Sequence, residues 1–226
     1  MNTKFYWRKL RTTAISPCFH GLFLRNRFLS NFVTSPLYRR AMAIIWVSVV
    51  VVVVTLTHTW FAFLVAWVFP LTILYQISAL LQFTSEHRWL VVPGVGKPAI
   101  ARKSLGRFMG EAPPDAPFSE QPREWLLWLL RMVGYHLPAR IAVISGELPE
   151  HDWHHRHPNH KDWANGVYHR QRDIEAGCPN WPEEYTEVWG LFNAVDCVFE
   201  GLSQMPRAAE EPKAIDMNAI APANRI

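Results

Sequence analysis

Two long apolar stretches dominate the first hundred residues of this chain. Ala41–Thr57 is mostly Ala, Ile, Val and Trp, and Trp60–Phe83 is a second apolar stretch. As helices with a rise of 1.5 Å per residue they span roughly 25 and 36 Å, enough to cross a hydrocarbon core of about 30 Å. Because only a short polar break separates them, the pattern predicts a tight transmembrane hairpin over residues 41–88, with a kink at Pro70.

The regions on either side of the hairpin have different compositions. Residues 1–40 interleave basic and aromatic residues, which is typical of a segment lying on a membrane surface. A disordered basic leader is the alternative for residues 1–15. Residues 89–123 are rich in Pro and Gly, so they predict a loop.

The remaining sequence, residues 124–204, predicts a helical cap on the cytosolic side. It begins with Glu124–Met132, which is rich in Trp and Leu but too short to span, so we expect an interfacial helix that Pro138 ends. Residues 165–202 mix aromatic and charged side chains and predict one or two helices beneath the membrane, and residues 205–226 predict a disordered tail. The expected fold class is therefore all-α: a transmembrane helical hairpin, an interfacial helix and a cytosolic helical cap that carries a histidine box.

Charge distribution orients this arrangement. Lys and Arg occur at both outer ends of the hairpin and are absent from its turn, so both termini are expected on the cytoplasmic side of an integral membrane protein. The net charge of +4 is modest, and we interpret the basic residues as contacts to anionic headgroups, with no role in binding nucleic acid. These basic residues are Arg25, Arg27, Arg39, Arg40, Arg88, Lys97, Arg102, Lys103 and Arg107.

Cysteine usage also favours a cytosolic location. Cys18, Cys178 and Cys197 are widely spaced, so they form neither a disulfide framework nor a C-x-x-C metal site. The first apolar stretch begins near residue 41, behind a long basic segment, which is not the pattern of a secretory signal peptide.

A dense histidine cluster is the strongest candidate functional site in the sequence. In the run HDWHHRHP, His151, His154 and His155 stand at i, i+3 and i+4, which places them on one face of a helix. Imidazole is the commonest side-chain ligand for iron and zinc near neutral pH. His87 directly follows the second apolar stretch, so it is expected at the same membrane surface. We therefore predict a metal site with the ligands His87, His151, His154 and His155; a merely basic or pH-sensitive surface is the alternative.

Other residues near the cluster have supporting roles in this interpretation. The carboxylates expected to orient the imidazoles are Glu86, Glu147, Glu150 and Asp152. The histidines expected to lie outside the site are His20 and His136, which are isolated and structural, His58 on the opposite membrane face, His157 off the ligand face, and the solvent-facing His160 and His169.

The order of these features over residues 30–160 resembles the carboxyl-terminal half of a membrane fatty acid desaturase. Members of this superfamily of integral membrane di-iron oxidoreductases carry three histidine boxes, H-x-x-x-H, H-x-x-H-H and H-x-x-H-H, and an isolated histidine after the fourth span. The third box matches His151, His154 and His155, with Pro158 following it, and the isolated histidine matches His87 in the run SEH.

This resemblance implies a di-iron centre that uses O2 to introduce a double bond into a fatty acyl chain. It implies no catalytic residue beyond the metal ligands. The substrate would be a membrane lipid or an acyl carrier, and a ferredoxin or a cytochrome b5-type protein would donate electrons. Part of the hairpin, Ile73 to Leu81 included, would line the acyl tunnel. Because hydroxylases share the scaffold, a lipid hydroxylase is an alternative.

The sequence departs from the family in one respect, because residues 1–86 hold only His20 and His58 and thus neither the first nor the second box. The chain is accordingly expected to be a fragment of an enzyme, or half of a site completed by a second chain that supplies the missing histidines. Two alternatives from other classes are a non-catalytic membrane metal-binding subunit and a metal-dependent hydrolase.

Overall fold

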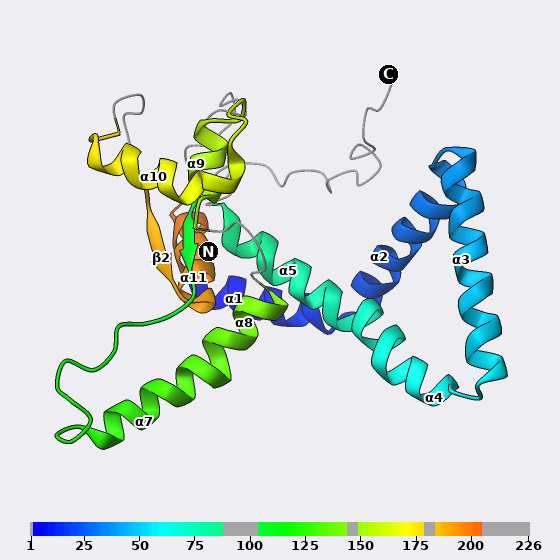
Figure 1. Cartoon of the computed structure of the whole chain (residues 1–226), viewed down its shortest axis with the longest axis horizontal. Helices are drawn as coiled ribbons and strands as arrows, with labels where there is room; N and C mark the ends of the chain where they lie inside the picture. The colour runs from blue at the N-terminus through cyan, green and yellow to red at the C-terminus, as the bar shows by residue number, and fades with distance from the viewer. Residues whose placement is uncertain (1, 88–103, 144–148, 179–183, 205–226) are drawn as a thin grey trace.

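The structure is a computed structural model that describes residues 2–87, 104–143, 149–178 and 184–204. Helices dominate it, as the sequence predicts, with an arm of apolar helices on one side and a mixed lobe on the other (Figure 1). The tail predicted over residues 205–226 lies outside the described residues.

The basic amino-terminal region is helical. Its elements are α1 (Thr3–Ala14), α2 (Pro17–Leu29) and the π-helical turn η1 (Ser30–Thr34). Asn2 and Ser16 cap the first two helices, because each side chain accepts a hydrogen bond from a backbone N–H three residues later. The Trp7 indole donates to Asp196 at 2.6 Å, and Leu10 is buried in the core. A disordered leader over residues 1–15 is therefore not what the structure shows: this segment packs against the carboxyl-terminal helix.

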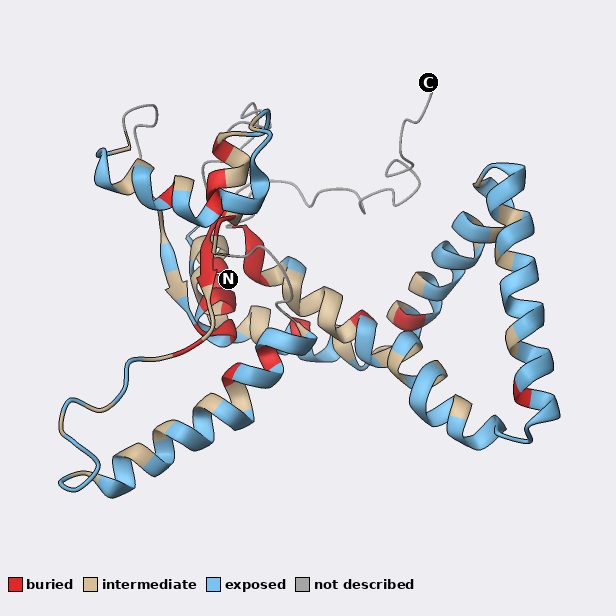
Figure 2. Ribbon diagram, in the orientation of Figure 1, coloured by how far each residue is buried: buried red, intermediate tan, exposed pale blue. Residues whose placement is uncertain are grey.

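Two apolar helices form the arm. The first is α3 (Leu37–Leu56); the second, Trp60–Glu86, comprises α4 (Trp60–Phe63), η2 (Leu64–Val68), η3 (Pro70–Leu74) and α5 (Tyr75–Glu86). With 20 and 27 residues, both are long and apolar enough to cross a membrane. Most side chains of α3, α4 and η2 are exposed, whereas most of those of α5 are half-buried or buried, as Figure 2 shows.

Local backbone geometry explains the turn and the proline positions in this arm. His58 adopts a left-handed φ of 53°, which helps to reverse the chain between the two helices. Pro70 is the first residue of the π-helical turn η3, two residues after η2 ends, so a change of helix type accommodates the missing N–H and the bulk of the ring.

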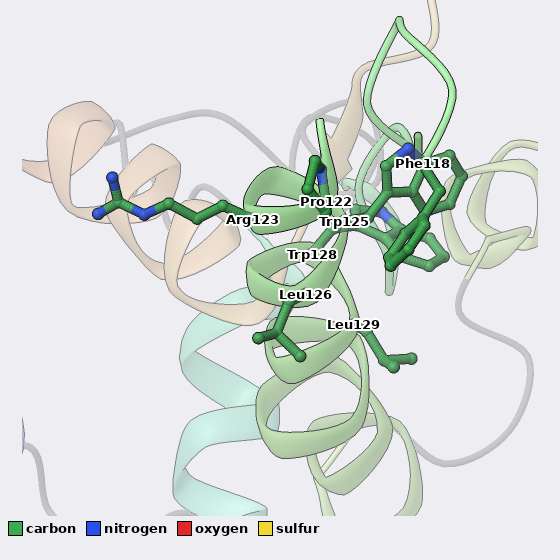
Figure 3. A pocket seen from close by; sticks show the side chains of 7 residues that line it. All are labelled: Phe118, Pro122, Arg123, Trp125, Leu126, Trp128 and Leu129. Atoms are coloured by element: carbon green, nitrogen blue, oxygen red, sulfur yellow. The ribbon is translucent and has the colours of Figure 1, made fainter. Parts of the chain in front are cut away.

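A third exposed helical run projects from the lobe. It consists of α7 (Pro122–Arg131), η4 (Met132–His136) and α8 (Leu137–Ala142). The prediction that Pro138 ends this helix was wrong, because Pro138 occupies the first turn of α8 directly after a π-helical turn, where its missing N–H is tolerated. Trp125 and Trp128 gather beside Phe118 while Arg123 points away (Figure 3).

The lobe contains a small parallel sheet that the sequence analysis did not predict. Strand β1 (Gly106–Phe108) pairs with β2 (Glu187–Trp189), and Arg107 lies opposite Val188. The lobe helices are α9 (His151–Arg156), η5 (Trp163–Asn165), α10 (Gly166–Glu175) and α11 (Leu191–Ser203). The two helices α10 and α11 match the one or two expected over residues 165–202.

The core of the lobe sits where α11 packs against α5, α1 and β1. Its most buried side chains are Leu105, Ala194, Val195 and Val198. Figure 2 shows the buried positions gathered at this junction, at the end of α5. The core therefore fixes the last turn of the second apolar helix, and with it the residue that follows, His87.

Candidate metal centre

His87 is placed by a change from helix to extended backbone. It follows the last residue of α5, has φ −133° and ψ 144°, and forms an isolated antiparallel bridge with Ser104. Its ring is buried, and its Nδ1 lies 3.0 Å from the Ser104 hydroxyl. Because a partner at one ring nitrogen sets the role of the other, Nε2 is the nitrogen left for a metal.

Helix α9 supplies two more imidazoles. His151 and His155 are one turn apart, and their Nε2 atoms lie 3.2 Å from each other. The Nε2 atoms of His151 and His87 are 3.4 Å apart. One ligand nitrogen from each of the three rings lies within 4.8 Å of the other two. The structure thus brings together three of the four predicted ligands from two distant parts of the sequence.

Two of the three nitrogen separations fit a single metal ion. For metal–imidazole bonds of about 2.0–2.1 Å, two ligands at a tetrahedral angle have nitrogens about 3.3 Å apart. The Nε2 separations of His151 from His155 and from His87, 3.2 and 3.4 Å, lie on either side of this value. Three imidazoles on one ion would leave at least one coordination position for water or a substrate.

His154 faces away from this group. Its ring packs against Trp163 with centroids 4.1 Å apart, and it lies 6.2 Å from the His151 ring. At about 100° per residue, His155 is rotated by about 40° from His151 in one direction and His154 by about 60° in the other. Because His87 approaches from the side of His155, His154 is left outside. Its enclosed Nδ1 has no hydrogen-bond partner among the described residues.

A buried ion pair holds α9 in place. The Asp152 carboxylate accepts hydrogen bonds from Nε and Nη2 of Arg170 at 2.9 and 3.0 Å. Arg170 also donates to Glu187 at 2.7 Å, so the pair connects α9 to α10 and β2. Gly106 of β1 lies directly against it: a Cβ there would stand 2.8 Å from both Arg170 Nη2 and Asp152 Oδ2. Only glycine fits at that position without displacing the ion pair.

Arg107 connects β1 to the end of α5 beneath His87. Its guanidinium donates to the Ser85 hydroxyl at 2.8 Å and lies 3.5 Å from the Glu86 carboxylate. Burial lowers the pKa of Arg107 to about 10, although Glu86 opposes this shift. The prediction that Arg107 contacts lipid headgroups was wrong, since its side chain is fully buried.

The imidazoles of His87, His151 and His155 are held in their neutral forms. Burial, with smaller contributions from His155 and Arg107, lowers the pKa of His87 to about 4. Burial followed by repulsion from Arg107 and His155 lowers the pKa of His151 to about 2, and burial also lowers the pKa of His155. Neutral imidazole is the form that binds metal, so the site is ready to bind at neutral pH.

Two of the carboxylates expected to orient the imidazoles bind arginines. Glu86 pairs with Arg107, and Asp152 pairs with Arg170. The buried Glu150 packs against Gly166, where a Cβ would lie 2.7 Å from its carboxyl carbon. Glu147 lies outside the described residues.

The remaining histidines have other partners. His157 pairs with Asp173 at 2.8 Å, and His20 is buried between Gln76 and the carbonyl of Ala14. His160 and His169 are half-buried against Trp153, with ring centroids 5.0 and 5.3 Å away, so the prediction that they face solvent was wrong.

Ser104, Arg107 and Arg170 are the site residues that sequence reasoning missed. Ser104 and Arg107 lie in a segment with no helical or strand periodicity, and Arg170 lies in a charged helix whose buried face has no apolar stripe. At the expected tunnel wall, Leu80 and Leu81 pack against the lobe core.

Comparison of the chain with protein-family models, curated proteins and solved structures finds no match. The likeness to membrane desaturases therefore rests on the histidine pattern and its position after the apolar helices.

Substituting Gly106 with alanine should weaken the metal centre by displacing the Asp152–Arg170 pair. We expect a loss of roughly 1–3 kcal/mol in unfolding free energy and a drop of about 10–100-fold in Co(II) affinity. Thermal unfolding and Co(II) titration of the detergent-solubilised chain measure both. Gly134→Ala is the matched control, because nothing lies within 4 Å of a Cβ at Gly134. Equal behaviour of the two variants would contradict this account of α9.

Metal binding should persist in mild acid. Protons compete with a metal only as the pH approaches the folded-state pKa, which is about 4 for His87 and also lowered for His155. Co(II) affinity should therefore change less than about tenfold between pH 7.5 and 5.5. A synthetic peptide of residues 149–160, whose histidines have pKa values near 6.5, should lose more than about 100-fold. An equally steep loss in the intact chain would show that the imidazoles are not protected by burial.

Proposed function

We propose that this chain is a membrane-embedded, histidine-ligated iron protein that takes part in O2-dependent oxidation of fatty acyl chains. The observation that carries the proposal is the convergence of His87, His151 and His155 at the end of a helix long enough to cross a bilayer. In this arrangement α3 and the helix Trp60–Glu86 cross the membrane, and the lobe lies on the cytoplasmic side with both termini.

The ligand set supports a transition metal. The three donors are all imidazole nitrogens, which suit iron, zinc, copper or nickel better than calcium or magnesium. When bound, iron would supply the activation of O2 needed to attack an unactivated C–H bond. The likeness of the SEH and HDWHHRHP runs to desaturase motifs favours iron, a ferredoxin or cytochrome b5-type donor, and formation of a double bond.

The chain's own residues would hold and orient this centre. Ser104 fixes the ring of His87, while the Asp152–Arg170 pair fixes the helix that carries His151 and His155. The exposed apolar surface of the arm would guide an acyl chain from the bilayer toward the site, and the buried lobe core would exclude water from it.

A pair of irons needs more ligands than the three that converge here. His154 would join the site after its ring turns away from Trp163. Histidines of a second chain would supply the rest. The chain would then supply one half of a di-iron centre shared with a second chain.

The nitrogen spacing also favours a second candidate function. Three imidazoles around one ion with an open position is the ligand arrangement of catalytic zinc sites. A single-ion site would serve a metal-dependent hydrolase or a non-catalytic metal-binding subunit.

Metal content and product analysis together test the proposal. We expect the full chain in nanodiscs to retain iron after anaerobic Fe(II) loading. His151→Ala should reduce iron affinity at least about 100-fold, because losing a ligand costs more than losing a residue that only orients a ligand. His157→Ala is the control, because His157 pairs with Asp173 at the end of the same helix. Equal iron content in both variants would overturn the proposed ligand set.

Lipid analysis then separates the functions. An O2-dependent double bond formed with an electron donor and a complementing chain supports the oxidoreductase. Oxygen-independent activity of the zinc-loaded chain would indicate a hydrolase, and bound metal without either activity would indicate a non-catalytic subunit.

A further inference from the structure

A second site lies at the opposite end of the small sheet from the histidines. The first residue of β1, Gly106, contacts the Asp152–Arg170 pair, whereas the chain beyond β1 borders a cavity of about 740 Å³. The cavity lies between the loop after β1, the turn η4 and the junction of β2 with α11. Its main lining residues are Glu111, Arg131, Tyr135, His136, Trp189 and Phe192.

Aromatic rings held in fixed orientations form the apolar part of this cavity. Tyr135 stacks on Phe192 with centroids 5.1 Å apart, and Trp189 stacks on Phe108 at 4.8 Å. The Tyr135 hydroxyl also accepts a hydrogen bond from the Phe192 N–H at 2.8 Å. Trp189 and Phe192 nevertheless remain about half exposed. Pre-oriented, accessible aromatic faces attract organic cations, above all quaternary ammonium groups.

Opposite charges lie side by side at the edge of the same cavity. Arg131 Nε donates to a Glu111 carboxylate oxygen at 2.6 Å, and the Arg131 side chain is 52% exposed. An exposed pair of this kind is weakly held, so a ligand can compete for both partners. A carboxylate beside aromatic rings favours a cation, and the arginine favours a phosphate.

The wall of the cavity contains an unsatisfied polar group. His136 is buried, and its enclosed Nδ1 has no hydrogen-bond partner among the described residues. Such groups are rare in native structures. His136 also lies in the π-helical turn η4, and π-helical turns occur frequently at functional sites.

We propose that this cavity binds a zwitterionic phosphoester of the phosphocholine type. The quaternary ammonium would lie against Trp189, Tyr135 and Phe192 near the Glu111 carboxylate, and the phosphate would bind Arg131. This pairing uses the aromatic rings and both charges of the cavity. It does not depend on the proposed function of the metal centre.

The position of the cavity points to a bilayer phospholipid as the source of this headgroup. Arg131, Tyr135 and His136 belong to the helical run of α7, η4 and α8, whose exposed leucines continue away from the cavity. At its other end, the carbonyl of Ala142 accepts a hydrogen bond from Ser78, within the apolar helix Trp60–Glu86. The run is thus attached to a helix that can cross the membrane, and its apolar face is available to acyl chains.

Lipid retention by the full chain tests this site. Native mass spectrometry of the maltoside-solubilised chain, incubated with dioleoylphosphatidylcholine or dioleoylphosphatidylglycerol, reports which lipid stays bound. We expect at least fivefold higher retention of the choline lipid, and a loss of at least fivefold in Glu111→Gln and in Arg131→Gln. Arg123→Gln is the control, because Arg123 lies on the same helix and points away from its aromatic neighbours (Figure 3). Equal retention of the two lipids, or unchanged retention in both cavity variants, would overturn the proposal.

A soluble probe identifies the source of the ligand. Calorimetric binding of free phosphocholine, abolished in Glu111→Gln, would support the headgroup chemistry without a need for acyl chains. Retention of the choline lipid without binding of free phosphocholine would support a site that requires the acyl chains too. Circular dichroism verifies that the variants fold, and unchanged metal content separates this site from the metal centre.

Discussion

The buried ion pair between Asp152 and Arg170 is the interaction on which the rest of the metal centre depends. It joins the helix that carries His151 and His155 to α10, and through Glu187 to the small sheet. Removing one partner of such a pair typically costs 3–5 kcal/mol, because the other charge stays buried and unpaired. Gly106 allows the sheet to approach the pair closely. Two segments far apart in the sequence thus meet with the precision that a metal site requires.

The same region brings the end of the apolar arm to the cluster. Arg107 binds Ser85 and Glu86, so the last turn of α5 is fixed to β1, and His87 emerges at the edge of the sheet with Ser104 beside it. Burial of these groups has an electrostatic consequence as well. Burial of the rings, and to a smaller extent the positive charge of Arg107, disfavours imidazolium at His87 and His151, so both are kept in the metal-binding form. The burial and the Arg107 contacts that hold the site together therefore also keep its imidazoles neutral.

Sequence patterns predict the long-range outline but not the local contacts. The two apolar helices follow from their length, and the pairing of His151 with His155 follows from their i, i+4 spacing. The exclusion of His154 does not follow, because His154 and His155 lie on either side of His151 and only the approach of His87 decides between them.

The strands β1 and β2 have three residues each and no alternating pattern, so the local sequence does not predict their pairing. Pro138 has an ordinary helix-ending pattern, and the π-helical turn before it is a tertiary adjustment. The sequence alone groups Arg107 with the other basic residues near the membrane, and only the structure shows its buried partners.

X-ray absorption spectroscopy of the iron-loaded full chain tests the central claim most directly. The account predicts scattering from about three imidazoles at roughly 2.0–2.2 Å from the metal, in line with metal–nitrogen distances in protein sites. It also predicts the loss of one imidazole in His87→Ala, with the α9 pair still bound. Scattering from oxygen or sulfur ligands alone, or an unchanged imidazole number in His87→Ala, would contradict a centre shared between the apolar arm and α9.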